Sequence, residues 1–289
     1  MTTASVGKNR ITSLAADHPG LVKVGQAGWL AKGVVYVLAG VLAITVVIRA
    51  LGSTVGSSAI NGQTQEASPT GAIKEVAGLS GGRVLLVVLG VGLLIYALWR
   101  LLTAVLPGGM DAEALAMRVG YLVSAVLYAT FAITALSLSR QPAQRTDGNQ
   151  NVKDLTARVL GYPFGRVVIG AAGVIALGAG VYRVVKGAKG DVTDELSLSG
   201  LSPARIRLTK RLGVVGEVGR GIAVMLIGFF LLQAAITVDA QESTGLDGAL
   251  TRLSGSQWGR VVVALVAVGF FLYGLMCIGT FQHRILRAP

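Results

Sequence analysis

The chain has 289 residues, of which 53% are hydrophobic and only 14% are charged, and its formal net charge is +12. A soluble domain carries roughly 25% charged residues, so this composition is that of a membrane protein, in which charge is costly. Cys277 is the single cysteine and both histidines, His18 and His283, lie outside the apolar segments, which excludes an intrachain disulfide, a cysteine metal cluster and a haem held between membrane helices.

Six apolar runs follow one another along the chain. They predict transmembrane helices at 29–51, 83–106, 118–140, 166–187, 217–238 and 259–281. The shortest charge-free runs, such as Gly33–Ile48, have sixteen residues, which is about 24 Å of helix against a hydrocarbon core of about 30 Å. We therefore expect the flanking Lys and Arg side chains to snorkel to the interface.

The six runs form three copies of a two-helix unit. Connecting segments of equal length precede the second run of each copy, with the sequences GAIKEVAGLSGGR (71–83), DLTARVLGYPFGR (154–166) and GALTRLSGSQWGR (248–260). Their apolar spacing predicts a short amphipathic helix on the outer membrane interface. The fold predicted is an all-α integral membrane protein with six transmembrane helices from three parallel repeats, related by an axis along the membrane normal.

The same pattern divides the chain into segments. We predict a cytoplasmic tail at 1–24 without a cleaved signal peptide, repeats at 25–106, 116–188 and 213–281, a basic cytoplasmic loop at 189–212 and a tail at 282–289. With both termini cytoplasmic, sixteen of the 26 Lys and Arg residues lie on the cytoplasmic side. The positive-inside rule favours this orientation.

Three motifs within the repeats resemble those of a known family. The pattern Gly-x-x-x-Lys/Arg-Gly-x-x-Tyr, the segment Gly-Gly-Arg-Val-Leu-Leu and the segment Leu-x-x-Tyr-Ala-Leu-Trp-Arg resemble the actinobacterial family known as domain of unknown function 1206, most clearly at 28–40 and 71–102. The second and third copies depart from the pattern at Ser124, Ala125, Ala179, Glu217, Met276 and Cys277. The resemblance implies a bacterial inner-membrane protein with three repeats and implies no activity.

Three arginines follow the glycine that closes each connecting segment, namely Arg83, Arg166 and Arg260. Each sits at the start of a predicted helix, where the helix dipole disfavours a cation. Two interpretations stay open: the arginines bind lipid phosphate or the neighbouring repeat in a pseudo-threefold ring, or they only snorkel.

A second group of candidates lies in the loop predicted at 189–212. Arg205, Arg207, Lys210 and Arg211 follow a helix start at Ser202-Pro203. They form either a solvated positive-inside loop or a surface helix that contacts acidic headgroups or an acidic partner.

Few polar side chains fall within the predicted spans. Glu217 and Arg220 are three residues apart, so they can pair on one helix face, and the Gln233 amide can bond a neighbouring helix or line a cavity. Arg100 and Arg183 occupy equivalent positions at helix ends, where a cation anchors the interface and complements the helix dipole. Cys277 is expected to act as a small hydrophobic residue.

Two classes of function remain. The first is a structural or accessory membrane protein that binds anionic lipid or a membrane protein complex, and the alternative is a small transporter or channel with a site near the repeat axis. We expect no catalytic residues, metal or cofactor, because His, Asp and Glu are scarce in the spans, and no nucleic-acid partner, because the basic residues are dispersed over loops. The oligomeric state is left open.

Overall fold

The computed structural model describes residues 19–52, 73–74, 76, 81–105, 112–140, 148–192, 196 and 201–283. These residues form eight α-helices and one 3₁₀ turn at Phe281–His283. The predicted tail residues 1–18 and 284–289 lie outside the described residues, as does most of the first connecting segment. The fold statements below concern the described residues.

Six of the helices are long and apolar enough to cross a membrane, which confirms the six predicted spans. They are α2 (Pro19–Gly52), α4 (Gly82–Val105), α5 (Ala112–Arg140), α7 (Gly165–Lys189), α8 (Pro203–Thr237) and α10 (Gln257–Thr280). The first helix of each repeat begins earlier than predicted. Residues 203–212, which we assigned to a loop, are the first turns of α8, because the Ser202 side chain accepts a hydrogen bond from the Arg205 amide and Pro203 opens the helix.

The two short helices between spans confirm the amphipathic helices predicted in the second and third repeats. They are α6 (Gly148–Leu160) and α9 (Leu246–Ser254), which lie on one side of the molecule, here called the connector side. The glycines of the second and third Gly-Arg pairs are required by sterics. A Cβ atom on Gly165 would overlap the Val159 carbonyl, and one on Gly259 would overlap the Leu253 carbonyl.

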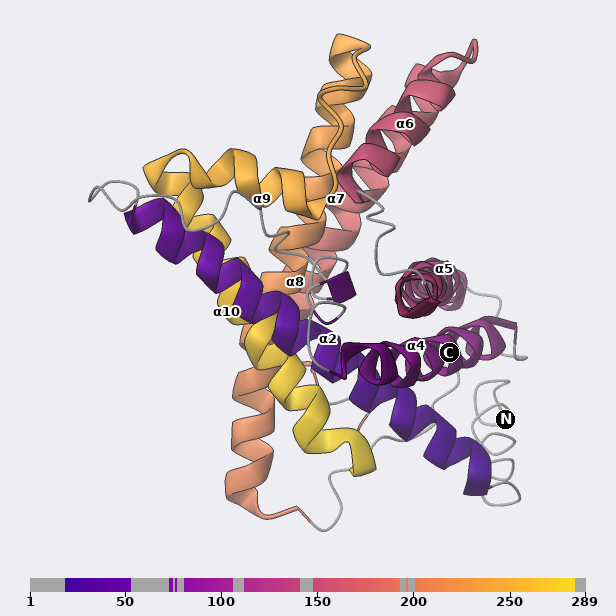
Figure 1. Cartoon of the computed structure of the whole chain (residues 1–289), viewed down its shortest axis with the longest axis vertical. Helices are drawn as coiled ribbons and strands as arrows, with labels where there is room; N and C mark the ends of the chain where they lie inside the picture. Colours follow the sequence, from indigo (N-terminus) through magenta and orange to yellow (C-terminus); the bar gives the residue numbers. More distant parts are fainter. Residues whose placement is uncertain are drawn as a thin grey trace.

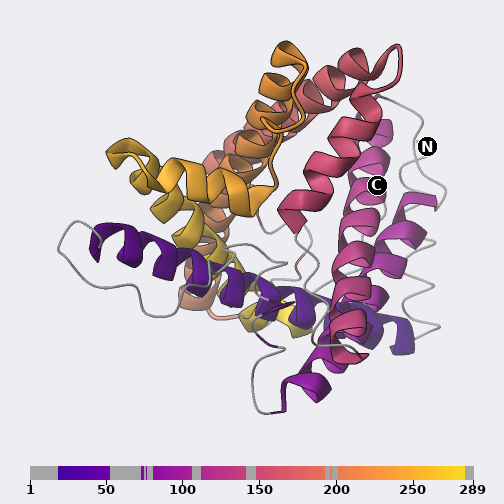
Figure 2. The same cartoon turned by 45° about the horizontal axis from the view of Figure 1, so that its top comes forward.

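The long helices pack as an open row rather than as a closed threefold ring. Its order is α5, α4, α2, α10, α8 and α7, and Figures 1 and 2 show the row twisting from one end to the other. First and second helices of the repeats therefore alternate, and the two helices of the second repeat, α5 and α7, lie at opposite ends. This differs from the threefold arrangement that three equal repeats predict.

Glycines bring the helices in the middle of the row into close contact. A Cβ atom added at Gly40 of α2 would lie 2.5 Å from the Phe271 backbone nitrogen of α10. Gly274 of α10 is equally close to Val37 of α2. Close approach of two backbones increases the contact area between membrane helices. This tightly packed pair, α2 and α10, lies at the centre of the row.

Candidate functional site

Buried and partly buried charges gather with aromatic rings where the helices of the row converge. This cation–aromatic cluster comprises Lys32, Arg100, Arg183, Glu217 and Arg220 together with the rings of Trp29, Tyr36, Tyr96, Tyr128 and Tyr273. All six long helices contribute at least one of these residues. The cluster is therefore built by the whole row and not by a single repeat.

Lys32 lies at the centre of the cluster. Its side chain is only 2% exposed, and its ammonium lies 4.5–5.4 Å from the centroids of four rings, those of Trp29, Tyr96, Tyr128 and Tyr273. Nζ also donates a hydrogen bond of 3.2 Å to the Tyr96 hydroxyl. Ring faces attract a cation by about 0.5–2 kcal/mol each, so the rings offset part of the cost of removing this ammonium from water.

Arg100 shares that hydroxyl with Lys32. Its Nε donates a hydrogen bond of 2.9 Å to Tyr96, and its guanidinium also stacks 4.9 Å from the centroid of Tyr121. Because one phenol oxygen accepts from two cations, Tyr96 ties α2 to α4. Arg100 is buried, whereas we expected it to anchor an interface.

Glu217 supplies the negative charge on the other half of the cluster. Its carboxylate accepts from Arg220 at 2.7 Å, which confirms the pair predicted three residues apart, and from Arg183 of α7 at 3.0 Å. The Arg220 guanidinium lies 4.1 Å from the centroid of Tyr273 and 5.1 Å from that of Tyr36. This half thus joins α7, α8, α10 and α2.

Equivalent positions of the repeats explain why these residues meet. Lys32 aligns with Arg220, and Arg100 aligns with Arg183. Each pair occupies the same register on a first or a second helix, so helix packing brings all four to one level. Among the described residues, the cluster has four cations for one carboxylate.

The level of the cluster along the helices can be placed against a bilayer. Lys32 lies twenty residues before the end of α2, and Arg100 lies eighteen residues after the start of α4. At 1.5 Å per residue these separations are about 30 and 27 Å, one hydrocarbon core from the connector side. Arg183 and Arg220 are at matching distances in α7 and α8. Measured along each helix, the four cations therefore lie about one hydrocarbon core from the helix end on the connector side, and the opposite side of the molecule is here called the cluster side.

The arrangement suits an anion. An excess of cations in a partly desolvated site attracts negative charge more strongly than the same cations would in water. Guanidinium groups bind phosphate and carboxylate oxygens through paired N–H donors. The chemistry available is therefore recognition of a phosphate-bearing or carboxylate-bearing group.

The arginines predicted on the connector side are not gathered there. Arg83 and Arg166 are exposed, and neither forms a hydrogen bond or ion pair with another described residue, while Arg260 is partly buried. Their helices α4, α7 and α10 are separated in the row by first helices, so the three arginines do not form a ring. The exposed rings of Tyr162 and Phe164 beside Arg166 are typical of a membrane interface.

The four basic residues of the predicted loop lie on the exposed start of α8. This part of the helix extends past Glu217 on the cluster side by fourteen residues, or about 21 Å. Arg205, Arg207, Lys210 and Arg211 are therefore on the same side of the molecule as the buried cations.

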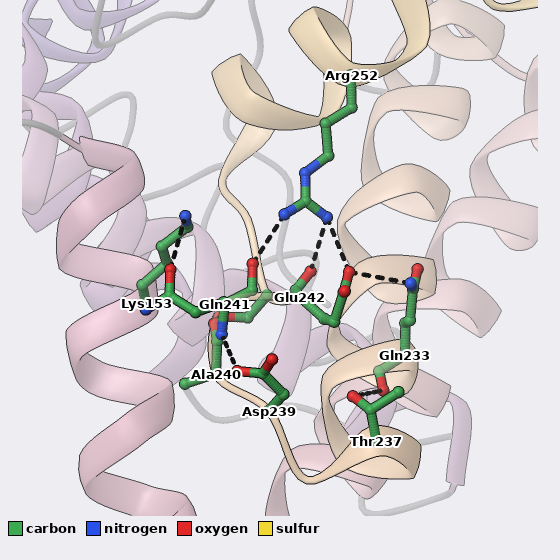
Figure 3. Close-up of polar contacts among 9 residues, drawn as sticks. Lys153, Gln233, Thr237, Asp239, Ala240, Gln241, Glu242 and Arg252 are labelled. Carbon is green, nitrogen blue, oxygen red and sulfur yellow. Dashed lines mark hydrogen bonds and ion pairs between the residues drawn. The ribbon is translucent and has the colours of Figure 1, made fainter.

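Gln233 lies away from the cluster, near the connector side (Figure 3). Its amide donates a hydrogen bond of 3.0 Å to the Glu242 carboxylate, which also accepts from Arg252 of α9 at 3.0 Å. The Gln233 amide thus bonds the loop after its own helix rather than a neighbouring span. Lys153 of α6 donates to Gln241 in the same loop at 3.2 Å, so this network holds the connector helices together.

Lys32 and the five rings were not among the residues proposed from the sequence. Lys32 was assigned to the edge of a span because it ends a charge-free run. The pattern Gly-x-x-x-Lys/Arg-Gly-x-x-Tyr carried the missing signal, since in the first repeat it places a cation, Lys32, and a tyrosine, Tyr36, four residues apart on one helix face.

Comparisons with known proteins agree with the repeats. The chain matches the family described as Domain of Unknown Function (DUF1206) over residues 27–106, 119–190 and 215–279. It is also 30% identical over 270 residues to "Uncharacterized protein YxxB" of Bacillus subtilis (strain 168), with 92% of each chain covered. No solved structure matches the chain.

Proposed function

We propose that this chain, which belongs to the family Domain of Unknown Function (DUF1206), is an accessory membrane protein that binds an anionic phospholipid headgroup at the cation–aromatic cluster. The observation that carries the proposal is the burial of the Lys32 ammonium. Its ammonium is buried among rings, and no carboxylate of the described residues pairs with it. Burying such a charge costs several kcal/mol, and ionisable groups kept at that cost within a membrane protein mark binding sites.

The depth of the cluster favours a lipid as the source of the anion. Measured along their helices, its four cations lie about one hydrocarbon core from the connector side, so in a bilayer that these helices span they would reach the phosphates of the opposite leaflet. The exposed basic residues at the start of α8 lie on the same side and would raise the local concentration of anionic lipid. With the orientation proposed from the positive-inside rule, this is the cytoplasmic leaflet of the bacterial inner membrane.

Stabilisation by lipid tests the proposal. A ligand that binds only the folded protein raises the unfolding temperature, so phosphatidylglycerol should stabilise the detergent-solubilised protein and phosphatidylcholine should not. Lys32→Met keeps the length of the side chain without its charge. We expect this variant to lose most of the rise in unfolding temperature that phosphatidylglycerol causes. Lys189→Gln, at an exposed lysine on the cluster side, should retain it.

Comparing the rise in unfolding temperature that lipid causes, rather than the unfolding temperature itself, separates an effect on binding from an effect on folding. A Lys32→Met protein with the full phosphatidylglycerol increment would contradict the proposal. Stabilisation by inorganic phosphate alone, with none from phosphatidylglycerol, would assign the cluster to a soluble anion instead.

A transporter or channel is the second candidate. It is favoured by a charged cluster to which all six long helices contribute, because transport sites place ionisable groups within the spans. Against it, each described long helix is continuous, since Pro19 and Pro203 open helices and Pro163 lies in the turn before α7, whereas transporter sites are typically formed by broken helices. Phosphate or anion flux in proteoliposomes that Lys32→Met abolishes would establish transport.

A further inference from the structure

The two helices of a repeat pack against each other in the first and third repeats. A Cβ atom at Gly28 of α2 would lie 2.8 Å from the Tyr96 Cβ of α4. The equivalent Gly216 of α8 would place one 2.7 Å from the Tyr273 Cβ of α10. The repeat therefore has its own helix–helix interface, which recurs with the same residues in register.

In the second repeat the corresponding face of α5 is uncovered. Gly120, the equivalent of Gly28, has no atom within 4 Å of an added Cβ. Val123 and Leu127, one and two turns further on, are 54% and 51% exposed, whereas Val35, the equivalent of Leu127, is 1% exposed. We call Gly120, Val123 and Leu127 the α5 face.

The matching face of α7 is uncovered as well. It comprises Ala172, Ile175 and Ala179, all exposed, with Ile175 at 68%. Tyr96 and Tyr273, the equivalents of Ala179, are both buried. Correspondingly, 22% of the most apolar stretch of α5 and 17% of that of α7 is buried, against 39–61% for the other four spans.

We propose that a second copy of this chain covers these faces, with the α5 face of one copy on the α7 face of the other and the reciprocal contact closing a twofold dimer. Internal repetition makes the two faces complementary, because their equivalents already pack within the first and third repeats. Within one chain they lie at opposite ends of the row, as both views show. The new contact continues established interfaces, since α5 already packs on α4 and α7 on α8.

The geometry of the faces suits association within a membrane. They contain no charged or polar side chain, and Gly120, Ala172 and Ala179 permit the close backbone approach that drives helix pairing in lipid. Exchange of equivalent elements between copies is a low-cost route to a twofold dimer. In register, Arg183 of one copy would lie at the level of Ser124 of the other, so the dimer would bring two cation–aromatic clusters together.

Disulfide trapping in native membranes tests the dimer. In a Cys277→Ala background, one tagged chain carries Gly120→Cys and a second, differently tagged chain carries Ala179→Cys, so a disulfide between them must join two copies. Random pairing puts about half of the chains in mixed dimers, so after mild oxidation we expect up to about half of the chains to migrate as a mixed dimer on a non-reducing gel. The control pair Val119→Cys and Val181→Cys is exposed at matching depth on other faces of the same helices and should give less than a tenth of that yield.

Other outcomes would overturn the proposal. A chain that carries both Gly120→Cys and Ala179→Cys and forms only an internal disulfide would show that its own row closes into a ring. The absence of any disulfide would show that lipid covers both faces, and equal yield from the control pair would show random collision. As a second measurement, Gly120→Leu should shift the purified protein from dimer to monomer in light scattering, whereas Gly178→Leu should not.

Discussion

Lys32 donates a hydrogen bond of 3.2 Å to the Tyr96 hydroxyl, and both residues are buried between the two helices of the first repeat. The same oxygen accepts from Arg100. The Tyr96 phenol is therefore an acceptor shared by both cations, and among the described residues no carboxylate pairs with Lys32.

Tyr96→Phe tests that role directly. The substitution retains the ring but removes the oxygen, so two buried charged donors lose an acceptor, and we expect the free energy of unfolding to fall by about 2–4 kcal/mol. Tyr182→Phe, at an exposed tyrosine, serves as the control and should change it by less than about 0.5 kcal/mol. Reversible unfolding in mixed micelles gives both values, and equal effects would contradict the shared-acceptor role.

Glu217→Gln should separate stability from ligand binding. Removing the carboxylate leaves the buried Arg220 without its ionic partner, at a cost of about 3 kcal/mol. The same change raises the positive charge of the cluster, so the stabilising increment from phosphatidylglycerol should increase. Glu242→Gln breaks the more exposed pair with Arg252, for which we expect less than about 1 kcal/mol and an unchanged increment.

Gly40→Ala and Gly178→Ala form a matched pair within transmembrane helices. The Gly40 methyl would meet the Phe271 backbone, which cannot rotate away, so we expect a loss of about 1–3 kcal/mol. The Gly178 methyl would meet nothing within 4 Å, and the higher helix propensity of alanine should stabilise by up to about 1 kcal/mol. Thermal unfolding of the two variants should therefore move in opposite directions.

Labelling of engineered thiols checks the proposed orientation. In a Cys277→Ala background, Trp258→Cys on the connector side and Ser202→Cys at the start of α8 are both at exposed positions. With both termini cytoplasmic, a membrane-impermeant maleimide should label Trp258→Cys on intact cells and Ser202→Cys only after permeabilisation. The reverse pattern would invert the topology derived from the Lys and Arg distribution.

The exposed basic residues of α8 should act through general attraction of anionic lipid. Changing Arg205, Arg207, Lys210 and Arg211 to Gln removes about 1 kcal/mol per charge near an anionic surface. Less phosphatidylglycerol should co-purify at low salt, while the difference from the unmodified protein should vanish in high salt. A salt-independent loss would instead indicate that these side chains belong to a buried site.

Several features of this protein could be derived from the sequence because they depend on local chemistry. Apolar runs determine where helices cross a membrane, and three gap-free connecting segments reveal the repeats. The spacing of Glu217 and Arg220 determines that they can pair, and the structure shows the bond. The turns at the second and third Gly-Arg pairs also follow locally, since a side chain on Gly165 or Gly259 would overlap the preceding short helix.

Only the tertiary structure decided how those elements combine. A cation at the edge of an apolar run has the same sequence pattern whether it snorkels or is buried, and the choice for Lys32 depends on four rings, one on its own helix and three on other helices. Equal repeats likewise permit a closed ring or an open row, because the same faces pack in both. The row leaves Gly120 and Ala179 uncovered, since helix packing depends on contacts between distant segments that no local pattern encodes.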